Sequence, residues 1–318
     1  MPSRELEQLV AMLRTRPRNA MLPSAVQLRS GFAMMTARLP PPADDVVFEP
    51  VDSGGVPGEW VSVPNSSKSR VLLYFHGGGY VFGSAAVYRD LVSRLCRAAG
   101  VRALSIDYRL APESRFPAAV EDAVTAFRWL LFQGIQPNQI VLAGDSAGGG
   151  LALATLVALR DQGEVLPAAA VCMSPLTDHA REGNSMLTKA ELDPILDPFI
   201  CAATSMYYLG QDGDMRAPLA SPIYADLAGL PPILILVGTW EVLLDDSTRF
   251  AERAKAAGVD VQIDVWDGMI HEWPFFAAII PEGREAIDQM GVYIRRRLDL
   301  IDTARDASGV RTNADRAI

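Results

Sequence analysis

The sequence contains few of the residues that build disulfide frameworks or metal sites. Only three cysteines and three histidines occur among its 318 residues. The cysteines, Cys96, Cys172 and Cys201, are scattered, and no CxxC pair or Cys/His cluster is present, so we expect no metal site. An odd number of isolated thiols is typical of a reducing compartment, and this predicts a cytoplasmic protein.

An excess of positive charge is also lacking. The formal net charge is −9 and the isoelectric point is about 4.9. A chain with this charge repels phosphate backbones, so we expect no nucleic-acid partner.

Long hydrophobic runs are absent as well. The longest, Leu230–Val237, contains two prolines and is far too short to cross a bilayer, so we expect no membrane span. The first ten residues, MPSRELEQLV, carry charge within four positions and lack the apolar segment typical of a secretory signal.

The sequence does contain a regular alternation of strand-like and helix-like segments, and its hydrophobic content of 49% suffices for a large core. Two short runs bounded by Gly and Pro, 46–48 and 60–63, are typical of antiparallel strands. Six further apolar runs have the composition of strands covered on both faces: 71–75, 101–106, 140–143, 168–173, 233–237 and 261–266. Helical segments alternate with most of them: 85–98, 117–131, 147–160, 245–257 and 282–298. This order predicts an α/β fold with a mostly parallel, eight-stranded sheet flanked by helices.

Two regions interrupt the alternation. The first holds two helical stretches, with apolar residues at helical spacing before residue 14 and a second stretch at 24–37 that ends before a run of prolines. The second lies between residues 173 and 233, where no strand is evident but 197–209 is a helical candidate. We expect a helical cap at 1–45 and 179–209, a core at 46–178 and 210–301, and a polar tail at 302–318.

The strongest chemical signal is Gly144-Asp145-Ser146-Ala147-Gly148, which directly follows the predicted strand 140–143 and opens an Ala- and Leu-rich helix. A serine on such a turn projects its hydroxyl above the sheet, and small neighbours let the turn approach other backbone closely. The helix dipole then faces any negative charge that develops there. A phosphate-binding loop is the alternative, but GxxxxGK[ST] is absent. We expect Ser146 to be a nucleophile and Asp145 a hydrogen-bonded residue of the turn.

A serine nucleophile needs a base, and the choice among the histidines is narrow. On an α/β sheet, an acid and then a histidine follow the serine along the chain. His76 precedes the serine, and His179 follows it by only 33 positions with no predicted strand between them. His271 lies just past the last predicted strand, at the sheet edge where reactive groups of open α/β sheets gather. The placement predicts His271 as the base.

A second motif, His76-Gly77-Gly78-Gly79-Tyr80, directly follows the predicted strand 71–75. Three glycines expose successive backbone N–H groups without obstruction by side chains, which suits an oxyanion hole. In enzymes with this pattern, the residue after the serine supplies a further donor, and here that residue is Ala147.

These motifs together resemble those of the hormone-sensitive-lipase-like family of α/β-hydrolases, the bacterial family IV carboxylesterases. The residues that carry the resemblance are HGGGY at 76–80, DYRLAPE at 107–113, GDSAGG at 144–149, Ser174-Pro175 with Asp178, and GMIH ending at His271. The resemblance extends from about residue 70 to 275 and implies an α/β-hydrolase fold with a helical cap. It also implies cleavage of carboxylic esters without a cofactor, with the N–H groups of Gly78, Gly79 and Ala147 as oxyanion donors.

The sequence departs from the family pattern at the acid. Where the family has Tyr-Asp-Pro-Leu-x-Asp-Glu, this chain has Trp240-Glu-Val-Leu-Leu-Asp-Asp246. Glu241 occupies the position of the catalytic aspartate, and glutamate can also hold the histidine tautomer. Asp245, one helical turn further on, is the alternative acid, although it can equally serve the N-terminus of a helix.

Four side chains are expected to contact substrate: Tyr80, Phe82, Met206 and Tyr207. Tyr208, Met34 and Met35 are further candidates for an acyl pocket, with a place in the core of the cap as the alternative. Arg109 and Glu113 are expected to tie a loop together through an ion pair.

The sequence therefore predicts a serine carboxylesterase that hydrolyses small esters of short to medium acyl chains through an acyl-enzyme. A binding protein is one alternative, because plant gibberellin receptors resemble this family but lack a working histidine; the presence of His271 argues against it. An amide or peptide substrate is the other alternative, since it would use the same mechanism. The predicted edge strand Val261–Trp266 is where we expect a homodimer to form.

Overall fold

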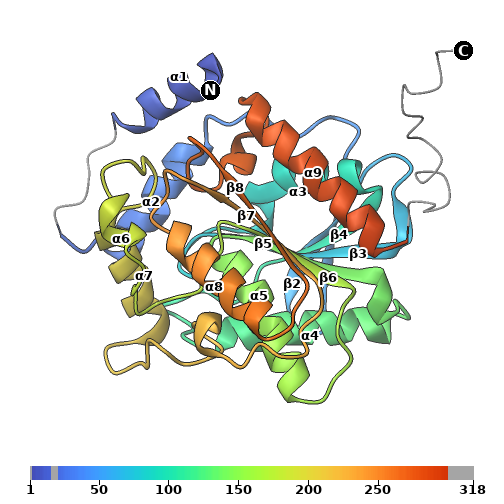
Figure 1. Ribbon diagram of the computed structural model, residues 1–318. Coiled ribbons are helices and arrows are strands. Elements are labelled where there is room, and N and C mark those ends of the chain that lie inside the picture. Colours follow the sequence, from blue (N-terminus) through green and yellow to red (C-terminus); the bar gives the residue numbers. More distant parts are fainter. Residues whose placement is uncertain (1, 16–20, 300–318) are drawn as a thin grey trace, which may run out of the picture.

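The computed structural model describes residues 2–15 and 21–299, and its strands form one sheet (Figure 1). The strand order is β1-β2-β4-β3-β5-β6-β7-β8. The strands are β1 (Val47–Asp52), β2 (Pro57–Ser62), β3 (Ser67–Phe75), β4 (Val101–Ile106), β5 (Ile140–Asp145), β6 (Ala169–Met173), β7 (Ile233–Gly238) and β8 (Val261–Trp266). β2 pairs antiparallel with β1 and β4, while the remaining neighbours pair in parallel. The predicted α/β fold with a mostly parallel, eight-stranded sheet is confirmed.

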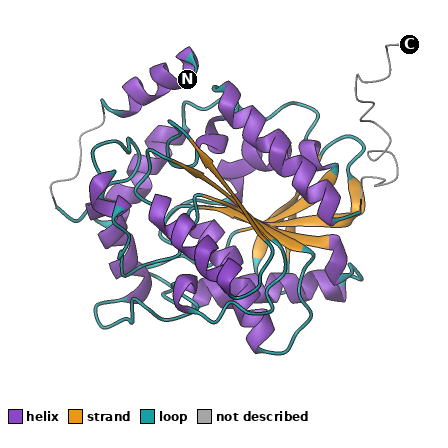
Figure 2. Cartoon of the chain, in the orientation of Figure 1, coloured by secondary structure: helices purple, strands orange, loops and turns teal. Residues whose placement is uncertain are grey.

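Helices cover both faces of the sheet (Figure 2). One face carries α3 (Arg89–Ala99) and α9 (Pro281–Arg297), and the other carries α4 (Ala118–Phe132), α5 (Ala147–Asp161) and α8 (Leu244–Ala256). Strand β3 shows why both faces are covered. Val71, Leu73 and Phe75 belong to one apolar cluster, whereas Leu72 and Tyr74 belong to the other. Because side chains alternate along a strand, a continuous apolar run needs cover on both sides.

The remaining elements are short or lie toward the carboxyl ends of the strands. The helix expected at 85–98 begins as a 3-10 turn, η1 (Ala85–Tyr88), before α3. Three further 3-10 turns are η2 (Pro137–Gln139), η3 (Pro222–Tyr224) and η4 (Trp273–Phe276), and a single α-helical turn, α6 (Ser185–Thr188), was not expected from the sequence.

Three helices, α1 (Arg4–Leu13), α2 (Ala25–Thr36) and α7 (Pro198–Leu209), come from the two regions that interrupt the alternation. Helix α1 buries its apolar side against the cluster under α3 and α9, and the Ser3 hydroxyl before it donates to Glu282 at 2.9 Å. Ser24 caps α2, because its hydroxyl accepts from the Gln27 N–H at 3.2 Å. The division into cap and core stays a prediction, and the predicted tail at 302–318 lies outside the described residues.

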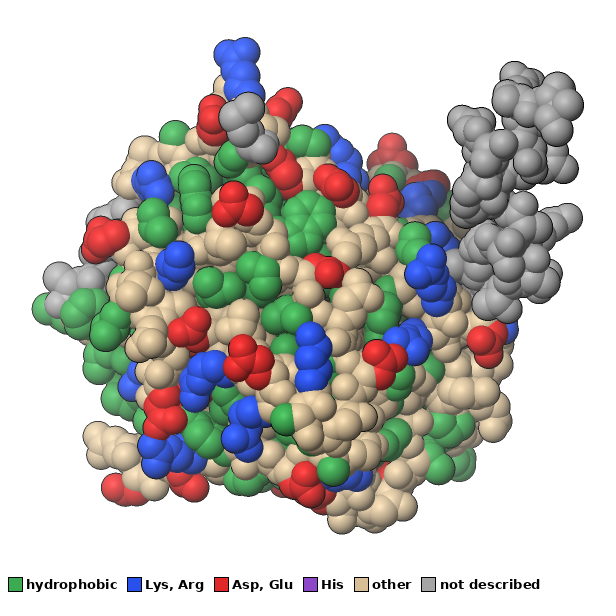
Figure 3. Space-filling model, viewed as in Figure 1, with side chains coloured by type: hydrophobic (Ala, Val, Ile, Leu, Met, Phe, Trp, Pro, Cys, Tyr) green, Lys and Arg blue, Asp and Glu red, His purple; other side chains and the backbone are tan. Residues whose placement is uncertain are grey.

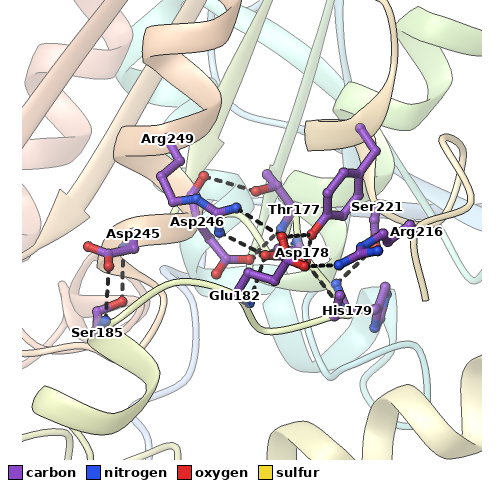
Figure 4. A network of polar contacts seen from close by, with 12 residues as sticks. Thr177, Asp178, His179, Glu182, Ser185, Arg216, Ser221, Asp245, Asp246 and Arg249 are labelled. Atoms are coloured by element: carbon purple, nitrogen blue, oxygen red, sulfur yellow. Dashed lines mark hydrogen bonds and ion pairs between the residues drawn. The ribbon is translucent and has the colours of Figure 1, made fainter.

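A buried polar network fastens the loop after β6 to helix α8 (Figure 4). One carboxylate oxygen of Asp246 accepts from the N–H groups of Thr177 and Asp178 at 2.8 and 2.9 Å. The Asp178 carboxylate in turn accepts from Arg249 at 2.7 Å. The network holds the start of α8 close to the end of β6.

The predicted ion pair between Arg109 and Glu113 is wrong. Arg109 pairs with Asp122 and Glu121, at 2.7 and 2.9 Å, and so fixes its loop to α4. Glu113 pairs with Arg29 of α2 at 2.6 Å. Both residues therefore have structural roles, but each connects its loop to a different element.

Within the described ranges, no helix combines the length and the apolar character needed to cross a bilayer. On the face shown in Figure 3, acidic and basic side chains are interspersed and no histidine is visible. The histidines are in fact buried, with His76, His179 and His271 at most 1% exposed. Any chemistry that they perform must therefore occur in the interior or in a cavity.

Candidate active site

Ser146 stands on a sharp turn between β5 and α5, at the carboxyl edge of the sheet. Its backbone lies at φ 51°, ψ −119°, a strained conformation for a residue with a side chain. The turn is tight because its glycines touch other backbone. A Cβ on Gly148 would lie 2.0 Å from the carbonyl oxygen of Phe75, and one on Gly144 would lie 2.3 Å from that of Gly148. The sequence therefore needs glycine at both positions to place the serine here.

Ser146, His271 and Glu241 form a continuous hydrogen-bonded chain. The Nε2 atom of His271 lies 3.0 Å from the Ser146 hydroxyl, and its Nδ1 atom lies 2.8 Å from a carboxylate oxygen of Glu241. Ser146 is 7% exposed, whereas His271 and Glu241 are almost fully buried. The three come from the ends of β5, β8 and β7, which are separated by many residues in sequence but meet at one edge of the sheet.

Glu241 is anchored on the side that faces away from the histidine. Its second carboxylate oxygen accepts from the Gly238 N–H at 2.6 Å and from the Ser174 hydroxyl at 2.9 Å. The alternative acid, Asp245, lies elsewhere. Its carboxylate accepts from the Ser185 N–H at 3.0 Å, so it joins α8 to α6 (Figure 4).

His179, which follows Ser146 by 33 residues in the sequence, takes no part in these hydrogen bonds. The Nδ1 atom of its ring lies 2.9 Å from the Ser205 hydroxyl. Its backbone N–H donates to the hydroxyl of Ser221 (Figure 4). Burial lowers its pKa to about 4, so it is neutral and held as a core residue.

The surroundings of His271 shift its pKa in two opposite directions. Burial lowers its pKa, but the hydrogen bond to Glu241 and the charges of Glu241, Asp193 and Asp145 together raise the pKa by more, so the net shift is upward. A buried carboxylate beside Nδ1 keeps the proton on that nitrogen. The lone pair of Nε2 then faces Ser146.

The glycine loop after β3 lies opposite Ser146. Gly78 and Gly79 have φ values of 112° and 60°, which favour glycine, and a Cβ on Gly78 would lie 2.1 Å from the Phe82 carbonyl oxygen. Tyr108 donates to the His76 carbonyl at 2.7 Å, which holds the start of the loop. Among the described residues, the N–H groups of Gly78, Gly79 and Ala147 donate to no protein acceptor. They are thus available to a bound oxygen.

Ser146 and His271 open into a cavity of about 460 Å³ with a largely apolar lining. Helix α2 contributes Leu28, Phe32, Met34 and Met35, and α1 contributes Met12 and Leu13. Helix α7 contributes Ile200, Cys201 and Thr204 on its facing side. A cavity of this kind suits a small ligand with an apolar part, and it places that ligand against the serine.

Of the predicted substrate contacts, Phe82 lines this cavity but the other three do not. The Tyr80 ring is buried and stacks on Tyr208 at 3.9 Å, because the loop turns it toward α7. Met206 and Tyr207 lie along a separate surface hollow near Arg115. The structure therefore places these three residues outside the lining of the cavity, and Thr204 and its neighbours present a different side of α7 to the serine. That Tyr80, Met206 and Tyr207 contact substrate stays a prediction.

Three residues near the triad escaped the sequence reasoning. Ser174 belongs to one of the motifs, but nothing in that motif indicates its hydrogen bond to Glu241. Asp193 accepts from the Val242 N–H at 3.0 Å, and burial raises its pKa to about 6. Glu272, directly after the base, lines the cavity with its carboxyl 3.6 Å from Nε2 of His271. Only its adjacency to His271 could have marked it.

The chain is similar in sequence to known hydrolases. A profile of the alpha/beta hydrolase fold matches residues 72–275. An acetyl-hydrolase from Streptomyces hygroscopicus is 48% identical over 255 residues, which cover 80% of this chain and 83% of that protein. The putative acetyl-hydrolase LipR from Mycobacterium tuberculosis is 37% identical over 252 residues, covering 79% and 81%.

The chain is also similar in structure to known esterases. The crystal structure of an esterase from the bacterial hormone-sensitive lipase family superposes with a TM-score of 0.89 at 47% identity, covering 94% of this chain and 99% of that one. The structure of EstE5 soaked with p-nitrophenyl butyrate superposes at 0.88 with 43% identity, covering 93% and 99%. The chain therefore belongs to the α/β-hydrolases and, within them, to the hormone-sensitive-lipase-like family of carboxylic ester hydrolases.

Proposed function

We propose that the protein is a serine carboxylesterase in which Ser146, His271 and Glu241 are the catalytic triad. The observation that carries the proposal is the chain of hydrogen bonds from Glu241 through His271 to Ser146, at 2.8 and 3.0 Å. His271 takes the serine proton as the hydroxyl attacks the ester carbonyl, and it later protonates the leaving alcohol. Water then releases the acyl group along the same path.

The negative oxygen of the tetrahedral intermediate is stabilised by the N–H groups of Gly78, Gly79 and Ala147. Gly78 and Gly79 line the cavity together with Ser146, Ala147 directly follows the serine, and none of the three N–H groups has an acceptor among the described residues. The N-terminus of α5 adds its dipole in the same direction. Loss of one such donor typically costs about 10²- to 10³-fold in rate.

The acyl chain is of short to medium length. A cavity of about 460 Å³ lined by Leu28, Phe32 and Met34 can enclose a small ester but offers little room for a long chain. With p-nitrophenyl esters from acetate to palmitate, kcat/KM is expected to be highest for the short and medium chains and to fall steeply toward palmitate. A maximum at palmitate would contradict this preference.

The enzyme assignment is tested by Ser146→Ala. We expect this variant to lose nearly all hydrolysis of p-nitrophenyl butyrate while keeping its fold. The matched control is Ser93→Ala, which removes a hydroxyl from α3 that bonds only its own helix. Turnover of matched esters and amides decides between an esterase and an amidase. Preference for the amide would replace the proposed substrate class.

Assembly and location stay predictions. Strand β8 is one of the two outermost strands of the sheet, and Val265 on it is 47% exposed. A homodimer through Val261–Trp266 would cover this strand. Light scattering of the protein and of Val265→Lys tests it, because only a dimer through β8 would dissociate in the variant. Cys96, Cys172 and Cys201 are free and buried, in keeping with the prediction of a cytoplasmic protein.

A further inference from the structure

Three oxygen atoms converge on the space beside Gly77, next to the proposed triad. A Cβ on this glycine would lie 2.2 Å from Oδ2 of Asp145, 2.6 Å from Oε1 of Glu272 and 2.8 Å from the hydroxyl of Tyr88. All three atoms are buried, and none has another hydrogen-bond partner among the described residues. Two carboxyl groups and a phenol therefore face one another in the interior.

If both carboxyl groups are ionised, the cluster has too few donor hydrogens for its carboxylate oxygens. The hydroxyl of Tyr74 donates to the other oxygen of Asp145, Oδ1, and so does not serve the cluster. The Ser146 hydroxyl also approaches Glu272, but in the proposed triad its hydrogen goes to Nε2 of His271. Tyr88 then supplies the one remaining hydrogen for the two carboxylate oxygens. Buried acceptors without a donor are costly, and two adjacent buried negative charges are more so. One further proton on a carboxyl group removes both problems.

Glu272 is the better site for that proton. Asp145 already accepts a hydrogen bond from Tyr74, which stabilises its charged form. For Glu272, burial and then the charge of Asp145 raise the pKa well above its usual range. Glu272 is also coupled to the triad, because its N–H donates at 3.2 Å to the Ser174 hydroxyl that bonds Glu241.

We infer that Glu272 is a positioning residue that acts in its protonated form, donating its hydrogen to Asp145 and keeping a second negative charge away from Nε2 of His271. This role rests on the proposed triad. An ionised Glu272, with its oxygen 3.6 Å from Nε2, would compete with Ser146 and with the leaving group for the imidazole proton. It would also oppose the negative oxygen of the intermediate. A neutral Glu272 leaves Glu241 as the charge that orients His271.

The groups that face Glu272 define what can change its ionisation. They come from β3, η1, the loop after β4, the end of β5 and the turn after it, the loop after β7 and its own loop: Tyr74, Tyr88, Tyr108, Asp145, Ser146, Glu241 and His271. In the proposed state, Asp145 and Glu241 carry the negative charges of this set, and both favour a protonated Glu272.

The first test detects the proton directly and does not depend on esterase activity. Infrared difference spectra of wild type and Glu272→Gln at pH 8 should show a protonated carboxyl band that the variant lacks. Glu285→Gln, on the exposed side of α9, is the matched control and should keep that band. Absence of a band that depends on Glu272 would overturn the inference, whereas loss of activity in all forms would instead count against the proposed function.

The second test is the pH profile of kcat/KM from pH 6 to 10.5, corrected for spontaneous hydrolysis. Wild type and Glu285→Gln should lose activity on the alkaline side, by about tenfold per pH unit, as Glu272 ionises. Glu272→Gln keeps a donor but cannot ionise, so its profile should lack this decline. A decline that is unchanged in Glu272→Gln, or no decline in wild type, would overturn the positioning role.

A further variant covers the case in which Glu272→Gln does not fold. Asp145→Asn removes the neighbouring charge, which should lower the pKa of Glu272. The alkaline decline should then move toward lower pH and the infrared band should disappear at a lower pH than in wild type. If neither moves, the two carboxyl groups do not share a proton.

Discussion

Replacement of Glu241 by glutamine provides a sharp test of how the triad is held. The carboxylate of Glu241 makes two different sets of contacts. One oxygen faces Nδ1 of His271 at 2.8 Å, and the other accepts from Gly238 N–H at 2.6 Å. A backbone N–H can only donate, so the glutamine carbonyl must take the Gly238 side. Its NH₂ group is then forced toward Nδ1.

This orientation sets the size of the effect. An NH₂ group that donates to Nδ1 stabilises the tautomer with its hydrogen on Nε2, and that nitrogen can no longer accept the Ser146 proton. Such a loss of the correct tautomer lowers kcat by about 10⁴-fold, equivalent to about 5 kcal/mol of barrier. Glu241→Asp keeps the charge but withdraws it by about one bond length, and a misplacement of this size costs about 10²-fold.

The assay is steady-state hydrolysis of p-nitrophenyl butyrate, with circular dichroism to verify the fold. Asp245→Asn is the matched control and should keep the wild-type kcat, because its carboxylate bonds Ser185 rather than His271. The reasoning would be refuted if Glu241→Gln kept full activity while Asp245→Asn lost it. Asp245 would then be the acid, and the hydrogen bond to Nδ1 would have no catalytic role.

Three further predictions concern pH and packing. His271 must be neutral to act as a base and its pKa is raised above the usual 6.5, so kcat/KM should fall as pH drops through a value above 6.5. A midpoint at or below 6.5 would contradict this. Gly148→Ala should lower the free energy of unfolding by about 3 kcal/mol, because its Cβ would meet the Phe75 carbonyl oxygen. Gly258→Ala, whose Cβ would lie in open space at φ 83°, should lower it by only about 1 kcal/mol. Equal losses for the two variants in guanidinium unfolding would refute the close-packed turn. Burial raises the pKa of Asp246 to about 8 in the folded chain, so the unfolded chain releases this proton at a lower pH than the folded chain. The free energy of unfolding should therefore fall as pH rises from about 4 to 8, by at most about 1.4 kcal/mol per pH unit. Asp246→Asn should flatten this slope, and an unchanged slope would show that Asp246 is ionised.

The sheet, and the meeting of Ser146, Glu241 and His271, could be predicted because both are encoded in short stretches of sequence. Apolar runs such as 71–75 and 140–143 mark strands buried on both faces, and Ser146 sits where a strand must turn into a helix. The carboxyl ends of parallel strands meet at one edge. His271, which follows the last strand, was therefore expected to lie near Ser146.

The lining of the cavity could not be predicted in the same way. Which side of α7 faces the serine depends on how the helix packs, and here Tyr208 turns inward to stack on Tyr80. That packing directs Met206 away from the cavity. The role of Arg29 as the partner of Glu113 was also hidden, since it depends on where α2 comes to rest. Such contacts join segments that no local pattern connects.

The cluster of Asp145 and Glu272 illustrates the same limit inside the site. Asp145 belongs to the motif around Ser146 and Glu272 directly follows His271, but nothing in either stretch indicates that their carboxyl groups meet beside Gly77. Their proximity arises from the turn after β5 and the loop after β8 reaching the same edge of the sheet.

The central claim is that the hydroxyl of Ser146 becomes covalently acylated during turnover. Rapid acid quench of the enzyme with p-nitrophenyl butyrate, followed by mass spectrometry of the digested protein, measures this directly. We expect a butyryl group on the peptide that contains Ser146, and no such adduct in Ser146→Ala. A butyryl group on a different residue, or full turnover by Ser146→Ala, would contradict the proposed mechanism.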